Sequence, residues 1–374
     1  MLENIFDPNN YLFWILVIGV LVGIIGFVFR SILVNFAFVY PNAKFEAIGN
    51  PFLSGKELSR VFNSKDIINF KEVLNTSRDY KVTGDTTYEL QRSLDQHFIK
   101  TIEMMRKDSS KKMNDFFDIY LEKLDFYLIK NILKKRMNNE KIDEKIVEES
   151  NTQTIKKFIF KLIDCKKEEI PLILKNHGFS KEIIVASSAE KVDFLTLDNA
   201  IDKYIINRFK QLKVPHNCVK AIQKFLNYFI DISNIKNVLR AKHIGYDKDA
   251  CNKLFLGEGQ EIADWKFKQM AETISVSEII TVLTGTSYHN PLKDMLENYN
   301  KEKSVQVLEN TLDVQFLKII RDISVENYIT IGPTLRFIIS KEFEIKNLKI
   351  IAKGVGEGLS TDLIQKFVIT ESGL

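Results

Sequence analysis

Ile235-Lys236-Asn237-Val238-Leu239 is one of three closely similar stretches in this chain. The other two read Ile-Lys-Asn-Ile-Leu at 129–133 and Ile-Lys-Asn-Leu at 345–348, so that successive copies lie roughly 106 to 110 residues apart. The apolar residues of each copy fall at helical intervals, which predicts an amphipathic helix. We expect the polar residues beside this apolar stripe to bond neighbouring helices, and these are Lys130, Asn131, Lys236, Asn237, Lys346 and Asn347.

An acidic residue precedes two of these stretches by four positions, at Asp125 and Asp231. The third stretch departs from this rule, because Lys341 stands at the corresponding place and Glu342 and Glu344 lie close by. We include Asp125 and Asp231 with the repeated Lys and Asn residues as a structural signature of the repeats.

A second pattern places one acid among apolar residues at helical intervals. It reads LDQHFI at 94–99, IDKYII at 201–206 and LDVQFL at 312–317, again in three copies and in register with the first pattern. Two independent patterns with nearly the same period predict three related helical units. We expect these units at 40–140, 141–250 and 251–374, arranged around a pseudo-threefold axis. Their period is too long for the common solenoid repeats.

The composition agrees with an all-α fold. The 374 residues include only 16 Gly and 7 Pro, which leaves few residues that interrupt helices. Fifty-three basic residues nearly balance 49 acidic ones, so the charge pattern does not indicate a nucleic-acid partner. The cysteines, Cys165, Cys218 and Cys251, form no CxxC pair, which is typical of neither a disulfide framework nor a zinc site.

Residues 1–39 precede the repeats and predict a membrane anchor. Tyr11 to Phe29 is a nearly continuous apolar run, and as a helix it would be about 29 Å long, enough to cross one hydrocarbon core. A secretory signal is the alternative, but acidic rather than basic residues precede the run. The first basic residues, Arg30 and Lys44, follow the run, which predicts an outside N-terminus and a cytoplasmic body. The apolar stretch from Ser31 to Val39 would extend the helix toward that body.

Three glycines in this run, Gly19, Gly23 and Gly26, are spaced four and three residues apart. This spacing places them on one face of a helix. A GxxxG face allows another helix backbone to approach closely, so we predict a helix-packing site in the membrane. Glycine is also common in membrane helices without such a role.

The sequence predicts no catalytic, cofactor-binding or metal site. Gly49 to Lys56 superficially resembles a phosphate loop, but five residues separate its glycines and Glu57 replaces the required hydroxyl. The five histidines show no metal-ligand spacing. Gly354 to Gly358 follows a helical run, and we expect it to end that helix before a new one begins at Ser360. No small-molecule substrate is therefore expected.

Several segments resemble the C subunit of archaeal ATP synthases, which is related to the d subunit of eukaryotic vacuolar pumps. Residues 231–242 look like the most recognisable helix of that family, and residues 341–348 resemble its C-terminal counterpart. The resemblance extends over residues 40–374, and further matching segments are Tyr40 to Ala47, Leu53-Ser54, Thr76 to Tyr80 and Gly285 to Tyr288.

The resemblance implies a non-catalytic rotor subunit. Such a protein would be a funnel of three helical domains at the cytoplasmic face of the cell membrane. It would transmit torque between a membrane rotor ring and a central stalk, and thereby link proton or sodium ion transport to ATP synthesis or hydrolysis. The expected partners are ring subunits, stalk subunits and membrane lipid, without nucleic acid. The alternatives are a membrane-tethered helical adaptor unrelated to ATP synthesis, or an enzyme with an unrecognised helical active site.

Overall fold

The computed structural model of the protein describes residue 8 and residues 11–77, 79–142, 144–150, 153–189 and 192–369. Within these ranges the chain forms α-helices and short 3-10 helices joined by turns, and no residue of them is in a strand. The predicted all-α class is therefore confirmed.

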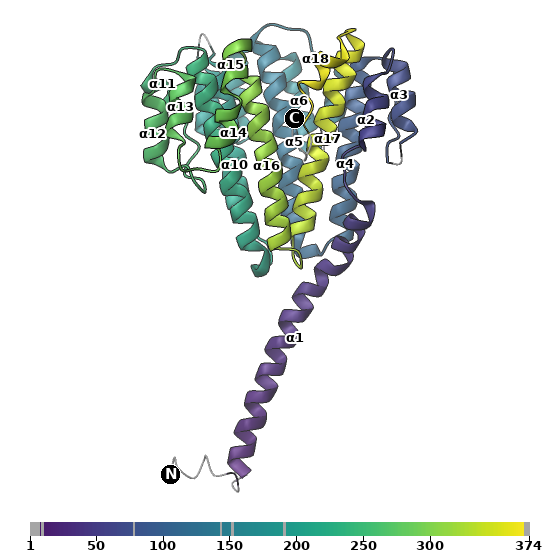
Figure 1. Cartoon of the computed structure of the whole chain (residues 1–374), viewed down its shortest axis with the longest axis vertical. Helices are drawn as coiled ribbons and strands as arrows, with labels where there is room; N and C mark the ends of the chain where they lie inside the picture. The colour runs from purple at the N-terminus through teal and green to yellow at the C-terminus, as the bar shows by residue number, and fades with distance from the viewer. Residues whose placement is uncertain are drawn as a thin grey trace.

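Three long antiparallel helix pairs form the body (Figure 1). They are α4 (Thr87–Asp108) with α5 (Asn114–Met137), α9 (Phe194–Lys210) with α10 (His216–His243), and α16 (Gln306–Glu326) with α17 (Gly332–Gly356). Contacts run from α4 through α5, α9, α10, α16 and α17 and return from α17 to α4. These six helices therefore form a closed ring, with the turns of all three pairs at the same end of the body (Figure 1).

Local sequence explains where these helices begin and turn. Thr86 caps α4, because its side chain accepts a hydrogen bond from the backbone N–H of Glu89. At the turn between α16 and α17, a Cβ on Gly332 would lie 2.5 Å from the carbonyl oxygen of Ser324. Only glycine fits there, and Pro333 then starts α17 with a backbone angle suited to a first helical turn.

The two repeated patterns lie on corresponding helices. The pattern at 94–99, 201–206 and 312–317 falls on α4, α9 and α16, the first helix of each pair. The Ile-Lys-Asn pattern falls on α5, α10 and α17, the second helix of each pair. The three units and their pseudo-threefold axis stay a prediction, but the placement of both patterns agrees with it.

Shorter helices pack on the outside of the second helices. Helix α5 contacts α6, helix α10 contacts α11, α12 and α13, and helix α17 contacts α2, α3 and α18. The helices α2 and α3 thus belong to the predicted unit 40–140 by sequence but pack on α17. The bounds of the outer helices are α2 Gly55–Phe62, α3 Ile67–Asn75, α6 Gln153–Asp164, α7 Ile170–Asn176, α8 Lys181–Ser187, α11 Lys248–Asn252, α12 Asp264–Glu272, α13 Val276–Val282, α14 His289–Asp294, α15 Leu296–Glu302 and α18 Thr361–Gln365.

Buried polar residues join the second helices to these outer layers. Asp231 accepts hydrogen bonds from the backbone N–H groups of residues 260, 261 and 262 and from the hydroxyl of Tyr288. Burial nevertheless raises the pKa of Asp231 to about 6. At the corresponding place on α17, Lys341 Nζ donates to the hydroxyl of Tyr80 at 2.8 Å. A tyrosine from an outer layer thus meets each of these two positions.

Glu344 is a buried acid in the same interface of α17. Its Oε1 accepts a hydrogen bond of 2.9 Å from the backbone N–H of Leu53, and the residue is only 1% exposed. Burial raises the pKa of Glu344 to about 7, above the ordinary value of 4.5. Protonation of Glu344 therefore stabilises the fold; this contribution is complete below about pH 4.5 and is lost as the pH rises through about 7.

We expect the substitution Glu344→Gln to remove this pH dependence. Glutamine keeps an oxygen acceptor for Leu53 and carries no charge. The free energy of unfolding of the variant relative to the parent chain should therefore increase by about 3 kcal/mol between pH 4.5 and pH 8. Chemical denaturation across this range measures the difference, with the exposed Glu297→Gln as a control that stays flat. A difference between Glu344→Gln and the parent chain that does not change with pH would contradict the assignment.

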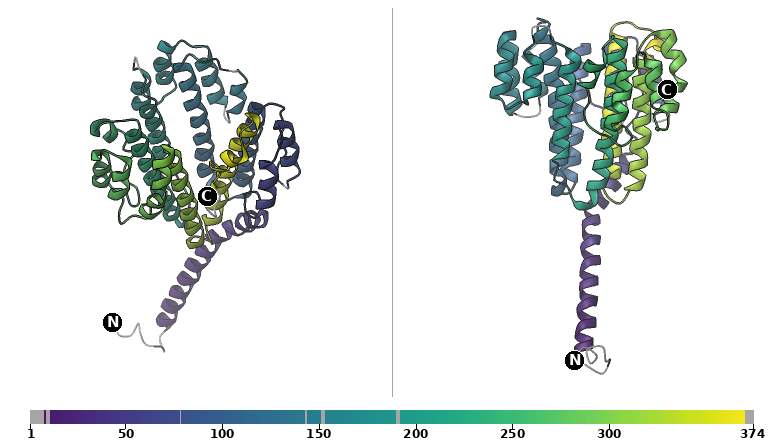
Figure 2. Two further views of the ribbon diagram at one scale, coloured as in Figure 1. Left: turned by 45° about the horizontal axis from the view of Figure 1, so that its top comes forward. Right: turned by 90° about the vertical axis from the view of Figure 1, so that its left-hand side faces the viewer.

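The first helix, α1 (Tyr11–Ile48), is continuous from the apolar run into the body. It crosses the predicted boundary at residue 39 and contains Pro41 in its interior. The span Tyr11–Phe29 is long and apolar enough to cross a membrane, and none of it is buried against the body. Figure 2 shows α1 extending away from the body at the end where the three long pairs turn.

Candidate functional site

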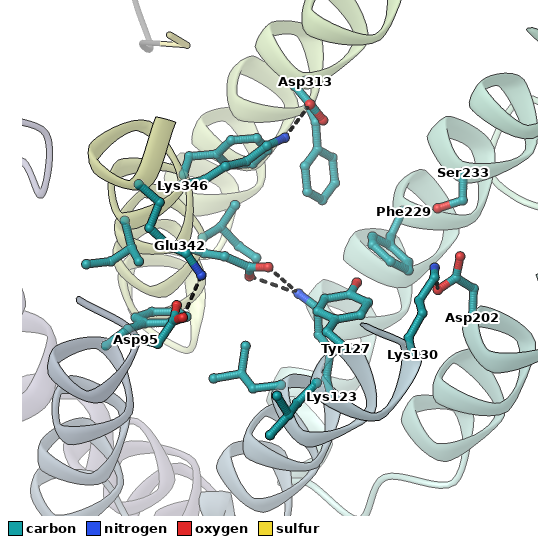
Figure 3. Close-up of a pocket in the computed structure, with 18 of the residues that line it drawn as sticks. Asp95, Lys123, Tyr127, Lys130, Asp202, Phe229, Ser233, Asp313, Glu342 and Lys346 are labelled. Carbon is teal, nitrogen blue, oxygen red and sulfur yellow. Dashed lines mark hydrogen bonds and ion pairs between the residues drawn. The ribbon is translucent and has the colours of Figure 1, made fainter. Parts of the chain in front are cut away.

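The closed ring of helices encloses a central cavity of about 660 Å³ (Figure 3). All six long helices contribute to its wall, and the second helices α5, α10 and α17 contribute most. The charged side chains of the wall are Asp95, Lys123, Lys130, Asp202, Lys236, Arg240, Asp313, Glu342, Lys346, Lys349 and Lys353. Basic residues outnumber acidic ones in this set, so the cavity favours an acidic partner.

Ion pairs join each long pair to the next around this cavity. Lys130 on α5 reaches Asp202 on α9 at 3.4 Å, and Lys236 on α10 reaches Asp313 on α16 at 2.5 Å. Lys349 on α17 closes the cycle with Asp95 on α4 at 2.5 Å. Each junction between pairs therefore carries a lysine from a second helix and an aspartate from a first helix.

A further layer of contacts lies one helical turn away. Lys134 pairs with Asp198 at 2.6 Å across the first junction, and Arg240 pairs with Glu309 across the second. Among the described residues the third junction has no such pair at this position, because Gln91 Nε2 instead donates to the carbonyl oxygen of Lys349 at 2.9 Å. In these two layers the first two junctions carry two ion pairs each and the third carries one. The first two junctions each have one more pair closer to the turns, Arg208–Glu122 and Lys224–Glu326.

Asp313 is an acid of the cavity that pairs with two lysines. It accepts from Lys236 and, at 3.2 Å, from Lys346, while its own side chain is only 8% exposed. Burial acts to raise its pKa, but the two lysines hold the pKa of Asp313 below its ordinary value. Asp313 is therefore a carboxylate that joins α10, α16 and α17.

The residues that line the cavity change from aromatic to charged along the axis of the ring. Toward the turns its wall is aromatic, and Phe225 and Phe316 are buried there. At the opposite end the side chains are charged and open, with Lys353 64% and Lys346 48% exposed. Near the aromatic end, Lys123 pairs with Glu342 at 2.8 Å and lies over the ring of Tyr120. A partner would therefore enter past basic residues toward an aromatic floor.

The structure separates the predicted signature residues. The cavity is lined by Lys130, Asn131, Lys236, Asn237 and Lys346. Asn347 instead bonds the backbone of Ile369 on the outer side, and Asp125 and Asp231 are buried outside the cavity wall. The three asparagines lie on corresponding helices but differ in environment, since Asn131 is exposed and Asn237 and Asn347 are buried.

Sequence reasoning missed the acids of the cavity. Asp95, Asp202 and Asp313 are the one acid of each copy of the first-helix pattern. Each of these acids is the second residue of its pattern, and this constant position was the signal that could have identified them. The predicted glycine face is on α1, where no atom lies within 4 Å of a Cβ added at Gly19, Gly23 or Gly26.

The rejected phosphate loop has a structural role. Ser54 and Glu57 form a capping box at the start of α2. The helix α17 ends at Gly356, inside the glycine-rich segment that was expected to end it. A Cβ at Gly354 would meet Ile364, and one at Gly356 would meet Thr87. No group of His, Cys, Asp and Glu able to hold a metal ion occurs in the part of the chain that the structure describes.

Among the described residues, this closed ring combines a charged cavity suited to binding a partner with no group able to hold a metal ion. The chain belongs to the ATP synthase (C/AC39) subunit family, whose model matches residues 41–367. The chain is therefore a structural subunit of an ATP synthase and not a catalytic one, as the sequence predicts.

Curated relatives agree over most of the chain. The A-type ATP synthase C subunit of Methanosphaera stadtmanae is 24% identical over 93% of this chain and 92% of its own length. The protein of the same name from Methanothermobacter thermautotrophicus is 27% identical, covering 88% and 86%. That of Methanobrevibacter smithii is 26% identical, covering 95% and 93%. The predicted family is therefore confirmed.

Proposed function

We propose that this protein is the central-rotor subunit of an A/V-type ATP synthase. In this role it couples a membrane rotor ring to the central stalk, and so links proton or sodium ion transport to ATP synthesis or hydrolysis. The observation that carries the proposal is a closed helical ring with two different ends. One end has the helix turns and the apolar helix α1, and the other opens into a basic cavity.

The closed ring suits the transmission of torque. Close-packed interiors transmit strain, and every junction in this ring is packed. The ion pairs at the three junctions, Lys130–Asp202, Lys236–Asp313 and Lys349–Asp95, oppose sliding of one long pair past the next. A torque applied by a partner in the cavity is then transmitted to the helix turns at the other end of the body.

The end of the body with the helix turns suits contact with the membrane rotor ring. At the turn between α16 and α17, Val325, Tyr328 and Ile329 are more than half exposed. These side chains lie at the end from which α1 leaves the body, so this end faces the membrane if α1 crosses it (Figure 1). The basic residues Arg30 and Lys44 after the apolar run support a body on the cytoplasmic side.

The open end of the cavity suits the foot of the stalk. On α10 the lining changes from Phe229 to Arg240 over about 16 Å of helix. A complementary partner has an apolar tip with acidic residues roughly three helical turns behind it. We expect the stalk protein that enters the cavity to show this pattern.

Purification of the tagged full chain from native membranes tests the proposal. Ring and stalk subunits should copurify, and neutralising two open-end lysines in Lys346→Gln/Lys353→Gln should weaken stalk retention about tenfold without loss of ring subunits. The matched control is Lys181→Gln/Lys293→Gln on exposed outer helices. Copurification without any ring or stalk subunit would instead support the unrelated adaptor.

A further inference from the structure

The helix α1 is held firmly to the body at the point where it arrives. Asn42 Nδ2 donates to the carbonyl oxygens of Tyr328 at 2.9 Å and Thr330 at 2.8 Å, in the turn between α16 and α17. Phe45 is 2% exposed and stacks on Phe337 of α17. Lys44 pairs with Asp108 at the end of α4 at 2.6 Å. The α1 helix is thus fixed to both the first and the third long pair.

The connection between these contacts and the apolar span is short and helical. Phe38 is already buried in the body at 3% exposed, and the apolar span ends at Phe29. The intervening residues belong to the same helix, about 14 Å in length. No loop lies between them, so the apolar span must turn whenever the body turns.

The apolar span lies beneath the body and not beside it. In Figure 1 the span from residue 11 to residue 29 lies within the width of the body. The view turned by 90° in Figure 2 places it within the width of the body again. A ring that shares the axis of the body would therefore surround this span.

The surface of the span is left uncovered by the body. Its large side chains from Tyr11 to Phe29, such as Trp14, Ile18 and Phe27, are largely exposed on all sides of the helix. The body buries none of the span. Its neighbours must come from lipid or from other membrane helices.

Building on the proposed rotor role, we infer that the span 11–29 occupies the lumen of the rotor ring and contacts the inner helices of the ring. The body turns with the ring in that role, and the span is fixed to the body. Rotation of a ring in the membrane can do work only against a membrane part that stays still beside the ring. A span outside the ring would be carried into this stationary part once per turn. The lumen is the position in the membrane that avoids this collision.

The partner surface is then a wall of apolar membrane helices. The charge-free surface of residues 11–29 suits it, because no charge is left unpaired in the apolar lumen. The face of Gly19, Gly23 and Gly26 gives the closest approach to a neighbouring helix. This interaction would centre the body on the ring in addition to the contact made by the helix turns.

Photo-crosslinking in the assembled complex tests the inference. A photoreactive phenylalanine analogue is placed singly at Val20, Leu21, Val22 and Gly23, which together sample every side of the helix. A fifth variant carries it at Ile329 in the turn between α16 and α17, to report contact of the body with the ring. We expect crosslinks from the span to ring residues that face the lumen, and from Ile329 to the cytoplasmic loops of the ring.

Each outcome separates the inference from the function on which it rests. Crosslinks from the span to the stationary membrane subunit or to the outer wall of the ring overturn the lumen position. Crosslinks from Ile329 to the ring, with none from any of the four span positions, also overturn it and leave the rotor role in place. Failure of all five positions to reach the ring overturns the rotor role itself.

Discussion

Replacement of Asp313 by Asn is expected to lower the free energy of unfolding by about 3–5 kcal/mol. The substitution removes the acid that both Lys236 and Lys346 approach, and it leaves Lys236, whose side chain is only 16% exposed, without this partner. A single charge left unpaired in a buried place is among the most destabilising changes that a fold can undergo. Chemical denaturation of the full chain in detergent measures the effect.

The corresponding acid on α4 supplies a matched control. Asp95 pairs with Lys349 where both side chains are about one-third exposed, so Asp95→Asn should cost less than about 1 kcal/mol. The double variant Asp313→Asn/Lys236→Met should recover most of the loss, because it removes the unpaired cation. If the two Asn substitutions lowered the free energy of unfolding equally, Asp313 would not stabilise the ring of helices more than Asp95 does.

Replacement of Ser233 by Trp is expected to abolish coupling without unfolding the protein. Ser233 is partly exposed on the cavity wall, between the aromatic floor and the basic open end (Figure 3). In the proposed rotor role the foot of the stalk enters the cavity, where a tryptophan would take up its space. We therefore expect binding of the stalk to weaken about 100-fold, or about 2.7 kcal/mol. ATP-driven ion transport in reconstituted vesicles should be lost, while ATP hydrolysis by the detached catalytic part continues.

The substitution Ser233→Ala is the control at the same position. It removes the hydroxyl and adds no volume, so transport and stalk binding should stay at the level of the parent chain. Normal transport by Ser233→Trp, with a melting temperature equal to that of the parent, would show that the stalk does not reach this depth.

The sequence was sufficient to predict the all-α class and to place the repeated stretches on helices. The Ile-Lys-Asn stretch carries apolar residues at helical intervals, and such local periodicity is visible without a structure. The apolar span of α1 was visible for the same reason. Its continuation past Pro41 was not, because that part is held by the hydrogen bonds of Asn42 to the turn between α16 and α17 and by the stacking of Phe45 on Phe337 of α17.

The cavity could not be predicted, because it depends on contacts between residues far apart in sequence. Asp95 and Lys349 are separated by 254 positions, and nothing in either local sequence identifies the other. The same limit applies to α2 and α3, which pack on a helix near the other end of the chain. The helical periodicity of the apolar residues predicts the buried face of each helix, but it does not predict which helix packs on that face.

The packing of α2 and α3 on α17 has a consequence for biosynthesis. Ribosomes add roughly 5–20 residues per second, so α17 emerges about 13 seconds to one minute after α3. During this interval the apolar side chains of α3, among them Phe70 and Leu74, lack the helix that completes their bundle. The nascent chain therefore leaves this apolar surface uncovered, and the ring closes only after translation has almost ended.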